Sequence, residues 1–383
     1  MKKQKQQKLI TIGIPAYNAE DHICDCLASI QIQSIVDEVC VIIAADDPKD
    51  NYNFVKQRFP ELDITILKCE KNTGPGLARQ RALEAATTDW ITFIDADDIF
   101  VSPIALEKLR DGITLGCIEV QGPFCQEVES NPQGIRMVPR NDLGHPWLFG
   151  RLYAVPFLKD NDIGFSALRA MEDGEINWKI RMTIEGTPLK INVIEDPIYF
   201  WRTGSEHSIT RIGIKENGGE PLYNWNLCQV GATAASINAI KFCKKKNPFN
   251  GEIARFTVEM MIGHYFTYIQ CLEKKPMFAE QNLFNAKRFY HECYKEIENQ
   301  IDDDIIKNMY TMQFAGHSQD MIGIIPQITF FDFMKKIKTE EYKGKEEFDK
   351  IRSQLPDWVI ELDKKSGVLG EEGYVYTIGE KEE

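Results

Sequence analysis

The stretch Trp90-Ile91-Thr92-Phe93-Ile94-Asp95-Ala96-Asp97-Asp98 predicts the fold of the first half of the chain. It opens with an apolar run of strand length, rich in aromatic and β-branched residues, and ends in three carboxylates within four positions. In α/β proteins, ligands bind beyond the carboxyl ends of the strands. We therefore predict a buried strand over residues 90–94 and a polar site at its end.

The residues before this stretch alternate between strand and helix patterns. Strands and helices are predicted in turn over residues 9–14, 23–30, 39–44, 54–59, 64–67 and 77–86. This alternation indicates an α/β fold, with a Rossmann-like, mostly parallel sheet and helices on both faces. The first strand runs into Pro15-Ala16-Tyr17-Asn18 and the second into Asp46-Asp47, so polar side chains gather at one edge of the sheet.

After Asp98 the patterns are shorter, and from about Tyr223 they become helical. Further helices and strands are predicted over residues 104–109, 117–121, 136–138, 175–184 and 189–201. We predict three parts: an α/β domain over residues 1–224, a mainly α-helical accessory domain over residues 225–335, and a Lys/Glu-rich helix with a C-terminal tail over residues 336–383. The helical domain is the candidate surface for a homo-oligomer.

The composition limits the classes of partner. The chain has 383 residues and a formal net charge of −13, which argues against extended contact with duplex DNA. No run of about 18 apolar residues is present, so no membrane span is predicted. The ten cysteines form no pair of C-x-x-C motifs and are interpreted as free thiols, which predicts a cytoplasmic protein.

The acidic turn Asp95–Asp98 is the strongest chemical feature of the sequence. Three carboxylates in four residues repel one another unless a cation lies among them. Oxygen ligands suit Mg²⁺ or Mn²⁺, and such an ion can hold a diphosphate and stabilise the charge that develops as it leaves. The alternative is a solvated acidic turn that caps the next helix.

Two other segments offer groups for a nucleotide. Asp46 and Asp47 follow the second strand, where a carboxylate can accept a hydrogen bond from a base N–H or a ribose hydroxyl, or can belong to an ordinary loop. Asn72-Thr73-Gly74-Pro75-Gly76 opens a helix that carries Arg79, and its backbone donors with this arginine are candidates for phosphate contacts. A plain tight turn explains the glycines equally well.

Glu172-Asp173 and His207 complete the candidate chemistry. Asp173 is a candidate general base that takes a proton from an acceptor hydroxyl, although an acidic pair at the start of a helix also serves as a cap. His207 is a candidate metal or phosphate ligand, and its alternative is a structural histidine.

Taken together, these segments resemble the family 2 glycosyltransferases with the GT-A fold. The matching segments occur in order at residues 14–18, 42–47, 72–79, 93–98, 172–173 and 199–210. The resemblance covers residues 8–212 and implies an inverting transfer from a nucleotide sugar, with UDP as the family's commonest nucleotide and Mn²⁺ or Mg²⁺ as cofactor. The acceptor is then a hydroxyl of a glycan, a protein or another molecule.

The resemblance also implies residue roles. The donor-binding residues are Pro15, Tyr17, Asp46 or Asp47, Arg79 and Asp95. Asp97 is implied as the direct metal ligand, with His207 or Ser208 near the metal and diphosphate, and Asp173 as the base of a single displacement.

Two departures from the family pattern bear on these roles. The usual Asp-Asp-Gly-Ser-Thr-Asp is replaced by Asp46-Asp47-Pro48-Lys49-Asp50-Asn51, which leaves open the choice between Asp46 and Asp47 as the contact for the base. After Arg79 the family commonly has Asn, whereas this chain has Gln80. Neither departure removes a metal ligand or the base.

Three other functions are weighed against the same residues. A sugar nucleotidyltransferase would carry a Gly-rich, Arg-containing loop where this chain has residues 15–18. A phage-type transferase acting on modified bases in DNA is disfavoured by the acidic charge, and an inactive nucleotide-sugar-binding scaffold by the presence of Asp97 and Asp173.

Trp147 and Arg151 are candidates for the acceptor side, because aromatic faces stack on sugar rings; core positions are the alternative.

Overall fold

We analysed a computed structural model of the chain, which describes residues 8–49, 51–128, 136–140, 147–168, 170–202 and 222–246 together with Thr257, Met261 and Phe289. The chain divides into two compact units, Met1–His207 and Ser208–Glu383. The domain boundaries expected at residues 224 and 335 stay predictions.

The first unit contains a seven-stranded sheet in the order β10-β6-β9-β4-β1-β2-β3. Its strands are β1 (Ile10–Ala16), β2 (Val39–Ala45), β3 (Ile64–Leu67), β4 (Trp90–Phe93), β6 (Cys117–Gln121), β9 (Arg151–Ala154) and β10 (Lys190–Val193). All neighbouring pairs are parallel except the two that β9 forms with β4 and β6. The predicted α/β fold with a mostly parallel sheet is therefore confirmed.

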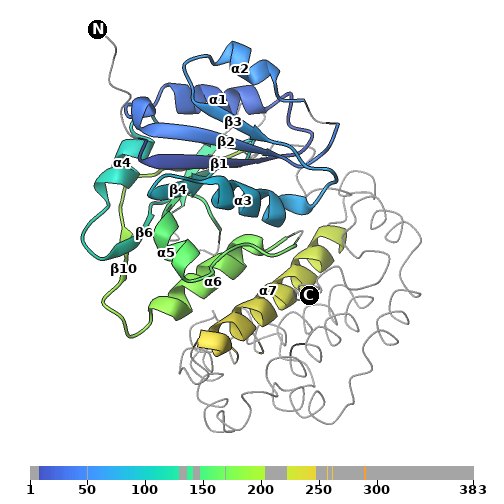
Figure 1. Cartoon of the computed structure of the whole chain (residues 1–383), viewed down its shortest axis with the longest axis vertical. Coiled ribbons are helices and arrows are strands. Elements are labelled where there is room, and N and C mark those ends of the chain that lie inside the picture. The colour runs from blue at the N-terminus through green and yellow to red at the C-terminus, as the bar shows by residue number, and fades with distance from the viewer. Residues whose placement is uncertain are drawn as a thin grey trace. The chain divides into compact units, whose positions relative to one another are not determined.

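Helices lie on both faces of the sheet, as the alternation predicts. In Figure 1, α1 (Ile23–Gln31) and α2 (Phe54–Arg58) lie on one side of strands β1 to β3, and α3 (Gly74–Ala85) lies on the other. Strand β1 is buried along its length apart from a half-buried Pro15, because it has a layer of helix on each face. The core of this unit thus surrounds the strands whose ends carry the candidate site.

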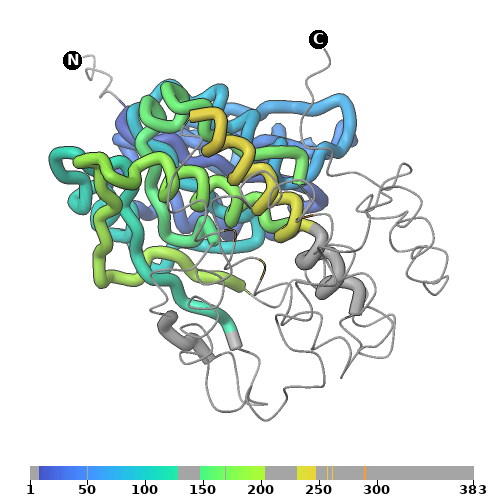
Figure 2. Tube along the Cα trace, turned by 90° about the horizontal axis from the view of Figure 1, so that it is seen from below, coloured from blue at the N-terminus to red at the C-terminus, as the bar shows by residue number. Residues whose placement is uncertain are grey.

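A second, four-stranded sheet has the order β5-β11-β7-β8. Its strands are β5 (Ile99–Phe100), β7 (Phe124–Val128), β8 (Arg136–Arg140) and β11 (Tyr199–Trp201). β11 runs parallel to β7 (Figure 2) and antiparallel to β5. This pairing brings Tyr199 beside the residues that follow β4.

The single strand predicted over residues 189–201 is wrong. The segment forms β10 in the large sheet and β11 in the small one. Pro197 lies between them and lacks an N–H for a ladder hydrogen bond, so the chain leaves one sheet before it enters the other.

The remaining described elements are 3₁₀-helix η1 (Val36–Glu38) and helices α4 (Ala105–Asp111), α5 (Val155–Asp160), α6 (Glu172–Ile184) and α7 (Leu222–Lys246). Helix α7 belongs to the second unit, and most of the predicted helical domain lies outside the described residues. Among the helices that the structure describes, none has the length and apolarity needed to cross a membrane. Seven cysteines in the described part of the chain, from Cys24 to Cys243, are free thiols, as predicted.

Candidate active site

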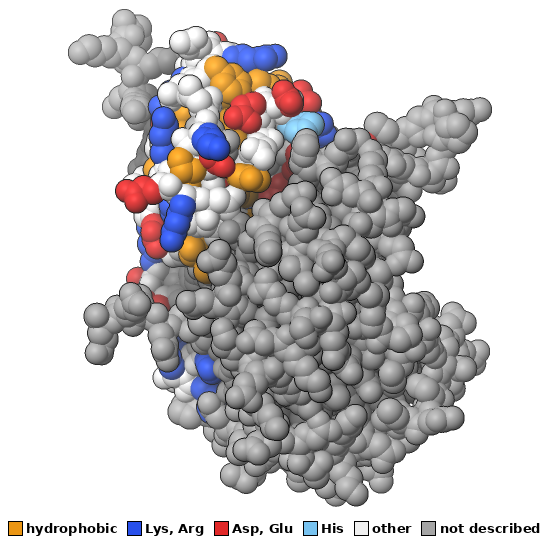
Figure 3. Space-filling view, turned by 90° about the vertical axis from the view of Figure 1, so that its right-hand side faces the viewer, with side chains coloured by type: hydrophobic (Ala, Val, Ile, Leu, Met, Phe, Trp, Pro, Cys, Tyr) orange, Lys and Arg blue, Asp and Glu red, His pale blue; other side chains and the backbone are white. Residues whose placement is uncertain are grey.

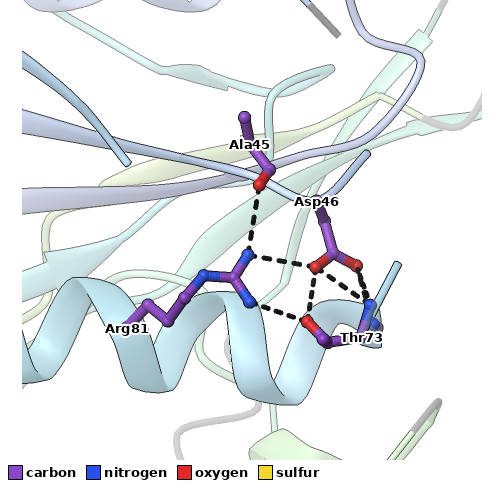
Figure 4. A network of polar contacts seen from close by, with 5 residues as sticks. Ala45, Asp46, Thr73 and Arg81 are labelled. Atoms are coloured by element: carbon purple, nitrogen blue, oxygen red, sulfur yellow. Dashed lines mark hydrogen bonds and ion pairs between the residues drawn. The ribbon is translucent and has the colours of Figure 1, made fainter. Parts of the chain in front are cut away.

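The end of β2 is tied to the start of α3 by Asp46. Its buried carboxylate accepts hydrogen bonds from the backbone N–H groups of Thr73 and Gly74, at 3.1 and 2.6 Å, and from the Thr73 hydroxyl. Arg81 donates to the same carboxylate at 3.0 Å and to the carbonyl of Ala45 (Figure 4). Asp46 therefore caps α3 and satisfies backbone donors that would otherwise be left at the helix N-terminus.

This cap differs from the predicted phosphate cradle. The backbone donors of Thr73 and Gly74, which were candidates for phosphate contacts, are already directed at Asp46. Gly74 has φ +84°, a left-handed conformation that favours glycine, so its presence is explained by the turn itself. Asp47 is half-buried and accepts a hydrogen bond from the backbone N–H of Lys49.

The turn after β4 is held from β11. The Tyr199 hydroxyl donates to Asp98 and accepts a hydrogen bond from the backbone N–H of Asp95 at 3.1 Å, and the backbone N–H of Arg202 donates to Asp98 at 2.7 Å. Burial, together with the charges of Asp97 and Asp95, raises the pKa of Asp98 well above its ordinary value. The hydrogen bonds that Asp98 accepts thus hold the turn after β4 in place.

Arg79 joins this turn to the start of α6. Its guanidinium donates through one terminal nitrogen to Asp95 Oδ1, at 2.5 Å, and through the other to Glu172 Oε1. Only 7% of Arg79 is exposed. Protein groups therefore offset the repulsion expected among the three acidic residues at two of them. Asp95 is paired with the Arg79 guanidinium, and Asp98 accepts hydrogen bonds from Tyr199 and from the backbone N–H of Arg202.

Asp173 lies in the first turn of α6, which begins at Glu172, three residues before the predicted start of that helix. The Asp173 carboxylate is half-buried, and its Oδ1 accepts a hydrogen bond from the backbone N–H of Gly174. Burial and the neighbouring Glu172 carboxylate raise the pKa of Asp173 to about 7, against the opposing effect of Arg79. A carboxylate with a pKa near neutrality suits a general base.

The backbone before Asp173 is strained. Met171, which precedes α6, has φ +67°, in the left-handed region that non-glycine residues seldom adopt. Such conformations cost on the order of 1–3 kcal/mol and persist only where the surrounding structure imposes them. The surroundings of α6 therefore fix the direction in which its first turn enters the site.

Comparison with known proteins agrees with this geometry. Residues 11–140 match the family described as glycosyl transferase family 2. These residues carry a family 2 glycosyltransferase domain. The matched residues include the ends of β1, β2 and β4 and all of α3. The resemblance that the sequence motifs suggested is thereby confirmed.

Several curated relatives are transferases by name. The chain is 29% identical over 224 residues to the poly(ribitol-phosphate) β-glucosyltransferase of Bacillus spizizenii, which covers 53% of this chain and 34% of the relative. It is 25% identical over 221 residues to the poly(ribitol-phosphate) β-N-acetylglucosaminyltransferase TarS of Staphylococcus aureus, covering 51% of this chain and 36% of the relative. The chain thus spans about a third of the length of these relatives.

A further relative and one solved structure complete the comparison. A UDP-Glc:α-D-GlcNAc-diphosphoundecaprenol β-1,3-glucosyltransferase of Escherichia coli is 33% identical over 94 residues, which are 24% of this chain and 37% of the relative. The crystal structure of S. aureus TarS 1–349 in complex with UDP matches with a TM-score of 0.47 and 18% identity, covering 81% of this chain and 93% of that one.

The divalent ion implied by the family fits a site built around the acidic turn of this glycosyltransferase domain. Asp97 is half-buried in that turn, between Asp95 and Asp98. Within the described part of the chain, no group of three His, Cys, Asp or Glu side chains forms a complete metal cage. An ion with one or two carboxylates and the remaining positions filled by phosphate and water matches the habit of Mg²⁺. His207 lies outside the described residues.

The remaining predicted donor residues lie at the end of β1 in the same domain. Tyr17 is 52% exposed, although it is a large aromatic residue, and the preceding Pro15 is half-buried at the strand's end. Asn18 has φ +47°, so the chain turns sharply after Tyr17. An exposed aromatic ring beside the end of a parallel strand suits a contact with a flat base.

The two acceptor-side candidates of the transferase domain lie in different surroundings. Trp147 is half-buried and packs with Phe149 and Trp201, with ring centroids 6.0 and 6.4 Å away. Arg151 is fully buried on β9 and forms an ion pair with the equally buried Glu119. Arg151 therefore serves the core in this structure, because a guanidinium without exposed surface cannot contact an acceptor.

Sequence reasoning missed Tyr199 and Glu172 as parts of the site. Tyr199 lay within a matched segment, but its contact with the acidic turn depends on the pairing of β11 with β5, and its partner atoms are 101 and 104 residues away. Glu172 was visible as the neighbour of Asp173, and its contact with Arg79 joins residues 93 positions apart. Neither long-range pairing leaves a local sequence signal.

Proposed function

We propose that this protein is an inverting glycosyltransferase that moves a sugar from a UDP-sugar donor to an acceptor hydroxyl by single displacement. The arrangement that supports this most is the half-buried Asp173 carboxylate, whose neighbour Glu172 is joined through Arg79 to Asp95 in the acidic turn. Asp173, whose pKa is raised, thus lies beside a series of paired charged groups, Glu172, Arg79 and Asp95, that extends toward the proposed donor side. Such a layout is what a base-assisted displacement requires.

On the donor side, Tyr17 and Pro15 contact the base, and Asp47 accepts a hydrogen bond from the base or the ribose. We favour Asp47 over Asp46 for this role, because the Asp46 carboxylate already accepts hydrogen bonds from Thr73, Gly74 and Arg81. Asp95 lies toward the ribose and sugar. One relative is named a glucosyltransferase and the name of another begins with UDP-Glc, which supports a UDP-hexose or a close analogue as donor.

Asp97 would hold Mn²⁺ or Mg²⁺, and His207 is the second residue proposed as a ligand. When bound, the ion neutralises the negative charge that develops on the departing diphosphate. Asp97 contributes a hard oxygen ligand at the edge of the sheet where the strands end, and Asp98 fixes the turn that presents it.

On the acceptor side, Asp173 takes the proton from the attacking hydroxyl as the new C–O bond forms at the anomeric carbon and the bond to the diphosphate breaks. A single displacement at an α-linked nucleotide sugar gives a β-linked product, and the names of three relatives specify a β-transfer. Two of these names also specify poly(ribitol-phosphate), which makes a polyol-phosphate polymer a reasonable first acceptor to test.

The two other functions have less support. A phage-type transfer to bases in DNA needs a basic surface, and the described face in Figure 3 mixes acidic, basic and apolar side chains without an extended basic patch. An inactive scaffold has no reason to keep a base with a pKa near neutrality beside an acidic turn.

The donor site is tested by thermal unfolding of the full chain with UDP, GDP, UDP-glucose and UDP-N-acetylglucosamine, each with and without Mn²⁺. A ligand that binds the folded state raises the unfolding midpoint by mass action. We expect UDP and UDP-sugars to raise the midpoint in a metal-dependent manner, and Asp97→Ala to abolish that dependence. Asp160→Ala, at an exposed position on α5, serves as the control and should behave as the wild type.

Two results would contradict the proposed donor site. A midpoint that no nucleotide changes would leave a degenerate scaffold as the better explanation. A metal-dependent shift that survives in Asp97→Ala would remove Asp97 from the metal site.

A further inference from the structure

Arg79 makes two contacts that its predicted place near the nucleotide does not explain. One terminal nitrogen of the guanidinium contacts Asp95, and the other contacts Glu172. Its side chain is 8% exposed, as is that of Glu172, whereas that of Asp95 is 32% exposed. The planar fork of the arginine thus links a half-exposed carboxylate on the donor side to a buried one at the start of α6.

The helix that carries Arg79 is itself held in place. The N-terminus of α3 is capped from β2 by Asp46, with hydrogen bonds to Thr73 and Gly74. Since β2 is a buried strand held between β1 and β3 in the large sheet, α3 provides a fixed support for the side chains on its other faces.

The same helix also holds the loop that leads to α6. Gly76 packs so closely on this loop that an added Cβ would lie 2.2 Å from the carbonyl oxygen of Ser166. One turn later, Gln80 accepts a hydrogen bond from the backbone N–H of Phe165 at 2.9 Å. Gln80, the residue that departs from the family's usual Asn, therefore serves this loop with its longer side chain.

We propose that Arg79 is a positioning residue that sets Asp173 against the donor by tying Glu172 to Asp95. The proposal rests on the glycosyltransferase function proposed above. Asp173 follows Glu172 in the same helical turn, so any shift of the buried Glu172 moves the Asp173 carboxylate with it. Arg79 acts through Glu172 and Asp95 and need not touch the substrate.

Lysine cannot replace arginine in this role. A Lys ammonium is a single point of charge, whereas the guanidinium presents two terminal nitrogens in fixed directions. With lysine at position 79, the positive charge remains near both carboxylates, but one of the two connections is lost. The Arg79→Lys variant therefore tests geometry while keeping the charge.

The experiment measures kcat and the donor KM of the full chain, by release of UDP from UDP-glucose or UDP-N-acetylglucosamine, for the wild type, Arg79→Lys, Glu172→Gln and the double variant. Because a misplacement of about 1 Å can cost on the order of 100-fold in rate, we expect Arg79→Lys to lower kcat at least about tenfold. The donor KM should stay within about threefold, since no uniform binding contact is removed.

The double variant tests whether the two residues act as a unit. If they do, Glu172→Gln should lower kcat in the wild-type background but have little further effect in the Arg79→Lys background. Arg110→Lys is the matched control, because Arg110 on α4 also pairs with more than one carboxylate (Glu38, Glu107 and Asp111), away from the site. Its kcat and KM should equal those of the wild type.

The outcomes separate this proposal from the proposed function. An inactive wild type that binds no nucleotide would refute the function itself. With an active wild type, normal kcat in Arg79→Lys, or fully additive losses in the double variant, would overturn the positioning role. A loss confined to donor affinity would make Arg79 a nucleotide ligand. If Arg79→Lys does not fold, Glu172→Gln alone tests the positioning role. We expect this variant to lose kcat without a change in the donor KM, because Glu172 is buried; an unchanged kcat would overturn the proposal.

Discussion

Asp173 combines a half-buried position with a negatively charged neighbour, Glu172, and both raise its pKa to about 7. At this value the carboxylate is charged in about half of the molecules at neutral pH. The same environment that prepares Asp173 to take a proton also makes its charged form unfavourable in the folded state. The residue therefore links activity to stability.

We predict a pH-dependent gain of stability for Asp173→Asn. The folded pKa of about 7 lies above the ordinary value of 3.8, so the wild-type residue favours folding at low pH and loses that contribution as the pH rises through 7. Asparagine resembles the neutral acid. The unfolding midpoint of Asp173→Asn relative to the wild type should therefore rise between about pH 4 and 7 and stay raised above pH 7.

Thermal unfolding of both proteins from pH 4 to 9 checks this, with Asp160→Asn, at an exposed position on α5, as the control. A midpoint difference that does not change with pH would show that the pKa of Asp173 is not raised by folding.

Among the elements, the strands with continuous apolar runs were predictable, whereas the short strands β5, β7 and β9 were not. β3 was predicted with its observed bounds and β2 ends one residue later than predicted, because both are runs of mostly apolar, β-branched residues bounded by polar turns. β9 was not predicted, since its four residues include a charged Arg151 that only a buried partner, Glu119, makes acceptable in the core.

Part of the candidate site could be named from the sequence and part could not. The acidic turn, Asp47 and Asp173 were named as candidates from the sequence, because each follows a recognisable strand or precedes a helix. What Arg79 contacts could not be found, since its partners Asp95 and Glu172 come from two other elements. Residue type predicts the chemistry that is available, whereas packing decides which charges are already paired.

Helix α3 leads to the prediction at the scale of elements. Gly76→Ala should lower both stability and kcat, because its new methyl group would meet the carbonyl of Ser166 at 2.2 Å and push the loop that leads to α6 away. Thermal unfolding and UDP release from a UDP-sugar measure the two effects.

Gly186→Ala separates the two effects. Gly186 has φ +71° and no atom within 4 Å of the added Cβ, so alanine should cost about 1–2 kcal/mol of backbone strain while kcat stays unchanged. Equal losses of kcat in both variants would indicate that reduced stability alone explains the effect of Gly76→Ala.

At the scale of the whole molecule, the formal net charge of −13 is distributed without a large basic region on the described face. Anionic substrates must therefore be held by a metal or by a few placed cations. The second unit, Ser208–Glu383, is described only in part, and the predicted homo-oligomer through its helical domain stays a prediction.

The central claim is that Asp173 in the full chain removes the proton during sugar transfer. Its most direct test is the rate of UDP release from a UDP-sugar, with Mn²⁺ and with poly(ribitol-phosphate) or water as acceptor, for the wild type and Asp173→Asn. We predict metal-dependent release by the wild type and a rate lower by about 10²-fold or more in the variant, with donor affinity nearly unchanged. Equal rates in the two proteins would contradict the account and leave Asp173 as a helix cap.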